Sequence, residues 1–207
     1  MQNYRCLLAT ILLVFITCIA MAQHASIAKS KFYPATDSRI QYVGRFDWSN
    51  AQLPRFWSPG AFIRIRFKGT KCVVKLQDQE LWGKNHNYLG VLLDNKIVSR
   101  LQTAGKNNEI VLADSLKNTV HTLLLCKNTE SNIGYLALEG FVCDSLLVPD
   151  PLPTRKIELI GNSITCTAGS DQSLVPCGKG EWHDQHNALM GYGPLTARAL
   201  NAQWVLS

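Results

Sequence analysis

Two different hydrophobic periods divide the chain near residue 149. Before that point, apolar and polar residues alternate in short runs, as in Ile63-Arg64-Ile65-Arg66-Phe67. A period of two is typical of a β-strand with one buried face. Because such runs are short, regularly spaced and uninterrupted by a helical pattern, residues 31–148 are predicted to form an all-β, jelly-roll-like sandwich. The other predicted strands cover residues 41–46, 72–76, 88–93, 96–101, 109–112, 121–126 and 135–143.

Turn residues separate several of these predicted strands. Asp94-Asn95-Lys96 predicts a tight hairpin between two of them. Pro59-Gly60 and Lys68-Gly69 predict the ends of two others, because proline and glycine interrupt regular structure.

The pattern changes after a proline-rich segment. Residues 149–154 contain Pro149, Pro151 and Pro153, which predict a short stiff linker. Beyond it, 155–160 predicts a strand, and 194–201 predicts a helix with Pro194 at its first position. Residues 203–206 predict another strand. This β-α-β order predicts that residues 155–207 open an α/β domain with a parallel sheet.

The N-terminus carries an export signal. Residues 7–20 are almost wholly apolar behind Arg5, and Ala20-Met21-Ala22 matches a cleavage site. Residues 1–22 are therefore predicted to be a signal peptide, which would make the protein secreted or periplasmic. A membrane anchor is the alternative, but the apolar run is short for a bilayer span.

Composition narrows the functional classes. The chain is 46% hydrophobic and 17% charged, which predicts a folded protein. Its formal charge of +6 is scattered, which argues against nucleic-acid binding. No Cys-x-x-Cys pair occurs, and we expect neither a metal nor a cofactor. Sequence leaves the disulfide pairing open among the cysteines beyond the signal peptide, although the last two flank one loop: Cys72, Cys126, Cys143, Cys166 and Cys177.

Ser163 is the candidate nucleophile. It follows the apolar run Ile157–Ile160 and a glycine, so it lies where the predicted parallel strand ends. In open α/β sheets the carboxyl ends of the strands are where ligands bind. An ordinary turn is the alternative, since Gly, Asn and Ser all favour turns.

The surrounding residues resemble a known family. Gly161-Asn162-Ser163-Ile164-Thr165 resembles block I of the SGNH (GDSL) hydrolases, in which aspartate usually takes the place of Asn162. The other matching segments are similar to carbohydrate esterase family 2, and the resemblance covers roughly residues 38–207. They are Gly44-Arg45-Phe46-Asp47, His121-Thr122, Lys127-Asn128-Thr129-Glu130, Gly134, Gly140-Phe141 and the segment from Tyr192 to Ala202.

This resemblance implies a flavodoxin-like hydrolase domain and a specific chemistry. The family removes acetyl groups from xylan and glucomannan, so the implied partner is an acetylated polysaccharide or oligosaccharide. Ser163 would attack the ester carbonyl to form an acetyl-enzyme, which water then hydrolyses. A histidine must accept the serine proton. The backbone N–H of Ser163 would be one donor to the developing oxyanion, and a glycine and an asparagine from later blocks would be the others.

The family's catalytic histidine would lie beyond Ser207. We therefore expect this chain to be the first part of a longer hydrolase and to have little activity alone. His183 and His186 bracket Asp184 and offer a local base, but we favour their interpretation as loop residues. Trp182 and His183 are the predicted substrate-binding residues, with Trp182 offering a face for a sugar.

A rival interpretation belongs to another class of protein. The sandwich alone would then be a carbohydrate-binding module, with Trp48, Trp57 or Trp82 exposed for glycan. A third possibility is a sandwich that only supports the hydrolase and shapes its cleft. Sequence does not separate these roles, and it does not give the oligomeric state.

Overall fold

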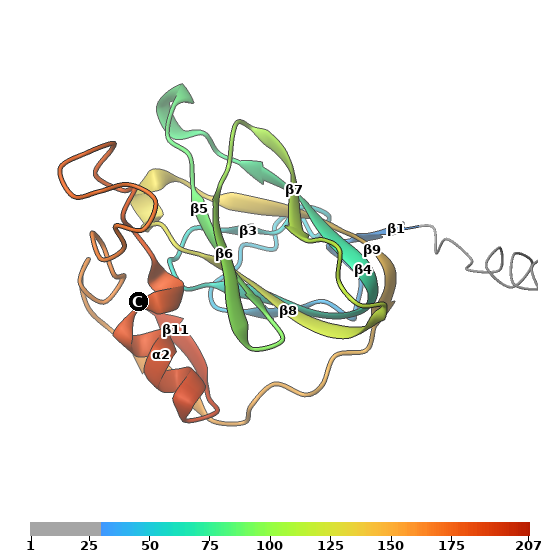
Figure 1. The fold of residues 1–207 in the computed structure, drawn as a ribbon. Coiled ribbons are helices and arrows are strands. Elements are labelled where there is room, and N and C mark those ends of the chain that lie inside the picture. Colours follow the sequence, from blue (N-terminus) through green and yellow to red (C-terminus); the bar gives the residue numbers. More distant parts are fainter. Residues whose placement is uncertain (1–29) are drawn as a thin grey trace, which may run out of the picture.

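The computed structural model describes residues 30–207, so the predicted signal peptide lies outside the described residues. Figure 1 shows a β-rich body with a smaller helix-containing unit beside it. An antiparallel ladder runs in the order β1-β9-β4-β8-β5-β6, with β2 and β7 paired to β4 and β3 paired to β9. The strands are β1 (Lys31–Pro34), β2 (Gln41–Val43), β3 (Arg55–Phe56), β4 (Phe62–Asp78), β5 (Tyr88–Leu93), β6 (Lys96–Gln102), β7 (Asn107–Ala113), β8 (Thr119–Lys127) and β9 (Leu136–Leu147).

The long strand β4 joins the two layers of the sandwich. Its first half pairs with β8 and, from Arg66 to Lys68, also with the end of β9, while its second half pairs with β7 and the rest of β9. Ile63 and Ile65 from the first half share one buried cluster with Val74 and Leu76 from the second half. The alternation of apolar and polar residues therefore places one face of each half in a common core, as the sequence predicts.

The predicted strand end at Lys68-Gly69 is wrong. Gly69 lies inside β4 with a φ of 148°, and the pairing with β9 shifts register between Lys68 and Cys72. A glycine at such a φ permits a bulge that bends the strand without ending it. One long bent strand thus replaces two predicted short ones.

The predicted hairpin is confirmed. Asp94 and Asn95 both have positive φ values, 50° and 63°, and link β5 directly to β6. Two successive left-handed residues form the turn whose twist matches that of paired strands.

The predicted parallel unit is also confirmed. Strands β10 (Lys156–Leu159) and β11 (Gln203–Leu206) pair in parallel, and helix α2 (Tyr192–Ala199) lies between them in the chain. The helix begins two residues earlier than predicted, so Pro194 lies within its first turn. A missing N–H is harmless there, because first-turn amides have no partner within the helix. The described residues also contain three short 3-10 segments: Leu81–Gly83, Ser131–Ile133 and Ala188–Met190.

The parallel unit packs on the outer face of the sandwich. Trp204 is buried with its ring 4.3 Å from that of Phe62, and its Nε1 donates to the carbonyl oxygen of Gly60 at 2.9 Å. A side chain at Gly60 would collide with Leu206. Side chains on β10 and β11 join residues of β2, β4, β5 and β8 in a second apolar cluster. Within residues 30–207, no helix has the length and apolar character needed to cross a membrane.

Candidate active site

Ser163 lies in a tight turn directly after β10. The Asn162 side-chain oxygen accepts the Ile164 N–H at 3.1 Å, and the Asn162 carbonyl accepts the Thr165 N–H at 3.0 Å. Asn162 therefore holds the turn through its side chain, a role to which asparagine is suited. The turn leaves Ser163 exposed to solvent.

The same turn contains a backbone N–H, that of Ser163, which is a candidate donor to an oxyanion. Among residues 30–207, the Ser163 N–H has no hydrogen-bond acceptor, while the Ser163 carbonyl accepts the Ala168 N–H at 3.0 Å. An N–H without an intramolecular acceptor, beside an exposed hydroxyl, is suited to stabilise the oxyanion that forms when such a hydroxyl takes part in acyl transfer.

Buried contacts anchor this turn to the start of α2. Thr165 is buried, and its hydroxyl lies 3.1 Å from the Tyr192 hydroxyl. A side chain at Gly161 would collide with Thr165, and one at Gly191 would collide with Thr167. Glycine at these positions lets the turn that carries Ser163 approach the helix closely.

A sandwich residue, Arg100, holds the segment that carries the two histidines. Its guanidinium donates to the carbonyl oxygens of Asp184 and His186, the latter at 2.9 Å from Nη2 and 3.2 Å from Nε. The group stacks 4.0 Å from the centre of the Tyr88 ring. The Tyr88 hydroxyl donates to the Asp184 carboxylate at 3.0 Å. Burial, with the hydrogen bond to Asp184, raises the pKa of Tyr88 to about 12.

A second sandwich contact comes from the Lys127–Glu130 segment. The backbone and side-chain oxygens of Asn128 accept the N–H groups of Ala188 and Leu189 at 3.3 and 3.1 Å. Fully buried Lys127 shapes this segment by donating to the carbonyl oxygens of Thr129 and Glu130 at 2.7 and 3.0 Å. Burial lowers the pKa of Lys127 to about 7, since the site disfavours charge.

Both histidines of the loop are buried against the sandwich. His183 is 2% exposed and His186 is fully buried. His186 Nδ1 accepts the Glu130 N–H at 3.5 Å. Burial lowers the pKa of His183, and it lowers the pKa of His186 to about 4. In the described part of the chain, no hydrogen bond joins either imidazole to the Ser163 hydroxyl.

Trp182 is exposed, as its predicted substrate role requires. Its side chain is 55% exposed, and its ring meets the rings of His183 and His186 edge-on at 5.7 and 4.9 Å. His183, the other predicted substrate residue, is therefore buried beside Trp182. The structure brings these rings together, but it places Ser163 in a separate turn.

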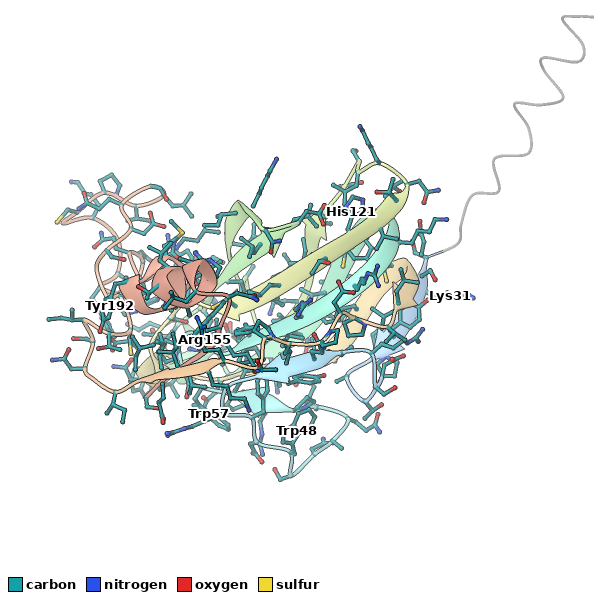
Figure 2. The ribbon with its side chains drawn as sticks, turned by 90° about the horizontal axis from the view of Figure 1, so that it is seen from below. Lys31, Trp48, Trp57, His121, Arg155 and Tyr192 are labelled. Carbon is teal, nitrogen blue, oxygen red and sulfur yellow. The ribbon has the colours of Figure 1, made fainter. Side chains whose placement is uncertain are left out.

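The sandwich tryptophans differ in exposure. Trp82 is 76% exposed, whereas Trp48 is 46% exposed and packs edge-on against Tyr42. Trp57 packs against Tyr135 at 5.0 Å. Figure 2 shows Trp48 and Trp57 at one edge of the sandwich and His121 at the opposite edge.

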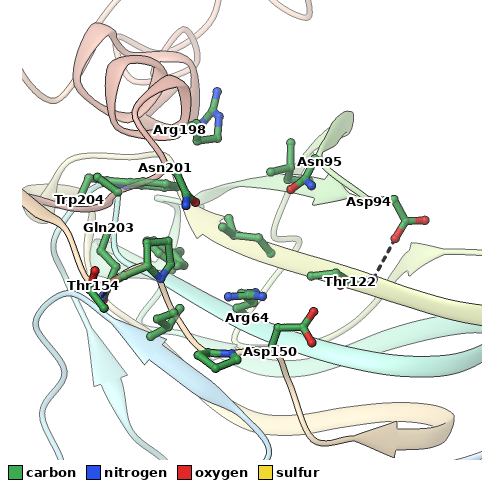
Figure 3. Close-up of a pocket in the computed structure, with 17 residues that line it drawn as sticks. Arg64, Asp94, Asn95, Thr122, Asp150, Thr154, Arg198, Asn201, Gln203 and Trp204 are labelled. Carbon is green, nitrogen blue, oxygen red and sulfur yellow. Dashed lines mark hydrogen bonds between the residues drawn. The ribbon is translucent and has the colours of Figure 1, made fainter.

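A separate groove runs between the sandwich and the parallel unit (Figure 3). Its volume is about 940 Å³, and the linker, the outer face of β4 and β8, and the end of α2 line it. Arg64, Asp150 and Trp204 are among its lining residues, whereas Ser163 and Trp182 are not. The groove is thus distinct from the candidate nucleophile.

Together these features define a class: a β-sandwich joined to an α/β unit that presents a serine at the carboxyl edge of its first strand. A family model described as carbohydrate esterase 2 N-terminal matches residues 42–151. The chain belongs to carbohydrate esterase family 2.

Three proteins illustrate this kinship. A cellulase/esterase of Acetivibrio thermocellus is 32% identical over 171 residues, which are 79% of this chain and 19% of that protein. An acetylxylan esterase / glucomannan deacetylase of Cellvibrio japonicus is 30% identical over 72% of this chain and 40% of its own length. A family two carbohydrate esterase from Clostridium thermocellum, solved with cellohexaose, is 30% identical with a TM-score of 0.67; the match covers 81% of this chain and 50% of that one. The chain therefore spans half or less of the length of these relatives.

Sequence reasoning missed the residues that hold the loop. Arg100 and Tyr88 belong to no recognisable motif, and their contacts with Asp184 join residues more than 80 positions apart. Asn128 lies in the Lys127–Glu130 segment that resembles the family, but the sequence does not reveal its partners. Only the folded chain identifies these contacts.

Proposed function

We propose that this chain is the N-terminal part of an exported serine esterase that removes acetyl groups from plant polysaccharide of the xylan or glucomannan type. Its parts would be a signal peptide (1–22), a sandwich (31–148), a linker (149–154) and the first part of an SGNH hydrolase domain (155–207). Family membership supports the reaction class, and the acetylxylan esterase and glucomannan deacetylase activity of the relative from Cellvibrio japonicus supports the substrate.

One observation carries the proposed mechanism: the turn after β10 exposes Ser163, and its backbone N–H has no acceptor among residues 30–207. In this mechanism the hydroxyl oxygen attacks the acetyl carbonyl carbon, and the N–H stabilises the resulting oxyanion. Collapse of the intermediate expels the sugar alkoxide and leaves an acetyl-serine. Water then attacks this ester and releases acetate.

The proposed base is a histidine outside this chain. Neither His183 nor His186 makes a hydrogen bond with Ser163 among the described residues, and the low pKa of His186 makes it a weak base. The 207-residue chain alone is therefore expected to hydrolyse little ester.

The decisive assay measures acetate release from acetylated xylan and glucomannan by the natural protein that contains this chain. Ser163→Ala is expected to reduce the rate by at least a hundredfold, because it removes the nucleophile. Ser170→Ala is a matched control, since Ser170 is an exposed serine of the same loop that only donates to the Thr167 carbonyl. Full activity in Ser163→Ala would overturn the mechanism.

The isolated chain gives a second assay. If residues 23–207 hydrolyse an aryl acetate and Ser163→Ala abolishes this activity, a catalytic base lies within the chain. Loss of that activity in His183→Gln or His186→Gln would identify the base. Such a result would contradict the proposed external histidine.

Substrate binding is proposed to involve Trp182, with His183 beside it. An exposed indole can stack on the apolar face of a sugar ring, and the two imidazoles fix its orientation. Affinity electrophoresis in gels that contain xylan or glucomannan should show weaker retardation for Trp182→Ala than for the unmodified chain. Equal retardation would remove Trp182 from the site.

The alternative function, a glycan-binding module, is favoured by the high exposure of Trp82. If the sandwich binds glycan, Trp82→Ala should abolish retardation in the same gels while Trp182→Ala leaves it intact. If Ser163 and Trp182 instead carry activity and binding, the sandwich serves mainly to hold the loop through Arg100 and Asn128.

A further inference from the structure

Two of the five cysteines among the described residues lie directly opposite each other in the sandwich. Cys72 of β4 pairs with Cys143 of β9 in the antiparallel register. Both side chains are fully buried in the same core cluster, so both point to the interior from the same face of the sheet. Both thiols are free in the structure.

The hydrogen-bond pattern shows which kind of pair they form. The N–H of Ala35, directly after β1, donates to the Glu139 carbonyl at 2.8 Å, so this carbonyl points from β9 toward β1. Hydrogen-bonded pairs alternate along an antiparallel ladder. Because carbonyl direction alternates along a strand, the Phe141 and Cys143 carbonyls also point toward β1, and Lys31 and Cys143 form a hydrogen-bonded pair.

The N–H and C=O of Cys143 therefore point toward β1. On the opposite side, toward β4, its pair with Cys72 is non-hydrogen-bonded. Opposed residues of this kind have Cα atoms about 4.5 Å apart and the closest side chains of the ladder. That separation falls within the range of roughly 4.4–6.8 Å spanned by disulfides.

We propose that Cys72 and Cys143 form a cross-strand disulfide when the protein folds in an oxidising medium. The thiolate of one cysteine attacks a small-molecule or protein disulfide, which releases one thiol and forms a mixed disulfide. The thiolate of the second cysteine then attacks the sulfur of the first cysteine in this mixed disulfide and releases the second external thiol. The two cysteines lose two protons and two electrons, and the external disulfide gains them.

Burial determines when this reaction takes place. It raises the pKa of Cys143 to about 12 and also raises the pKa of Cys72, and neither thiol is exposed. Oxidation therefore precedes closure of the sandwich layers, and the finished bond resists reductants while the protein stays folded.

The other three cysteines of residues 30–207 have no cysteine opposite them on a neighbouring strand. Cys126 faces Phe62 and Gly90 on its neighbouring strands. Cys177 is exposed and Cys166 is half-buried, both in the loop after Ser163. The proposal thus selects one pairing from those that the sequence leaves open, and it stands independently of the proposed esterase activity.

Refolding with peptide mapping tests the pairing. The reduced and denatured chain is refolded in a mixture of oxidised and reduced glutathione, alkylated under denaturing conditions and digested without reduction. Mass spectrometry should find the Cys72 and Cys143 peptides joined, with a mass lower by two hydrogens than the sum of the free peptides. Alkylation of both cysteines, or linkage of either one to another cysteine, would overturn the proposal.

Variants and stability provide the second readout. Cys177→Ala should keep the joined peptide, whereas Cys143→Ala should leave Cys72 alkylated. The oxidised chain should also unfold at a higher urea concentration than the chemically reduced chain, with no such difference for Cys143→Ala. Equal midpoints for the oxidised and reduced forms of the unmodified chain would contradict a bond that fits the native sheet.

Discussion

The sandwich and the parallel unit bury their apolar residues in different ways. The sandwich encloses Phe67, Phe141 and Leu125 between its own two layers. The parallel unit instead buries Trp204 against the outer face of the sandwich and leaves Leu195 and Leu200 of its helix region 42% and 47% exposed. The sandwich therefore supplies its own core, whereas the unit that carries Ser163 depends on the sandwich for its burial.

The largest expected effect comes from the sandwich core. Phe141→Ala should lower the free energy of unfolding by about 3–5 kcal/mol, because a fully buried ring leaves a cavity. Urea unfolding followed by circular dichroism measures the loss. Val120→Ala, at a position 44% exposed, is the control and should change stability by less than about 1 kcal/mol. Equal losses in the two variants would contradict an independent sandwich core.

A smaller effect is expected where the two regions meet. Trp204→Ala should weaken docking of the parallel unit by roughly 3 kcal/mol, since the ring packs on Phe62 and its N–H binds Gly60. Limited proteolysis should then cleave residues 155–207 faster while the sandwich stays protected. Leu200→Ala, which alters an exposed residue, should not change the cleavage rate. If Trp204→Ala destabilises the sandwich as strongly as Phe141→Ala, the two regions unfold as one unit.

Acid should also loosen this junction. The pKa of His186 is about 4 in the folded chain and 6.5 in its ordinary state, so the unfolded chain binds more protons between these values. Stability should therefore fall as the pH drops from about 6.5 to about 4, by on the order of 2–3 kcal/mol. Urea midpoints measured across this range should change less in His186→Gln.

His121 provides the matched control for the pH effect. Its burial disfavours the charged form, but hydrogen bonds to the Lys117 carbonyl and to Asp94 outweigh this and raise its pKa. Its contribution is thus present at low pH and lost as the pH rises through the folded pKa. His121→Gln should make the acid loss steeper. If neither variant changes the dependence of the urea midpoint on pH, these histidines do not determine the pH dependence of stability.

The smallest expected effect concerns the loop between residues 171 and 187. Arg100→Met should free this loop at a cost of about 1.5–3 kcal/mol, because charged hydrogen bonds to two carbonyls are lost. Hydrogen exchange should increase in the loop and not elsewhere in the sandwich. Arg66→Met is the control, since Arg66 pairs with Asp150 instead. Exchange that rises equally in both variants would contradict a local role for Arg100.

Sequence reasoning works well where structure depends on local patterns. Strands β5 and β11 have the bounds predicted from their apolar runs, and the Asp94-Asn95 hairpin follows from turn chemistry. Predictions from the sequence fail where tertiary contacts determine the structure. Gly69 predicts a strand end, but β4 pairs with β9 before and after this residue and therefore continues through it. The strand β3 has only two residues, too few to show an alternating pattern.

In the candidate site, too, local features follow from the sequence and contacts between distant residues do not. The strand-to-turn pattern predicts the position of Ser163, and the exposure of Trp182 fits its predicted role. The burial of His183 and His186 could not be predicted, because it depends on Arg100 and Asn128, which lie far away in the chain. The opposition of Cys72 and Cys143 likewise depends on strand register, which spacing alone does not reveal.

Covalent labelling tests most directly whether the Ser163 hydroxyl is the nucleophile of the natural protein. An activated fluorophosphonate forms a covalent adduct with such a serine and can be located by peptide mapping. If Ser163 is the nucleophile, an adduct forms on Ser163, none forms on Ser170, and esterase activity falls in proportion to labelling. Labelling of a different residue together with loss of activity, or full activity with Ser163 modified, would contradict it.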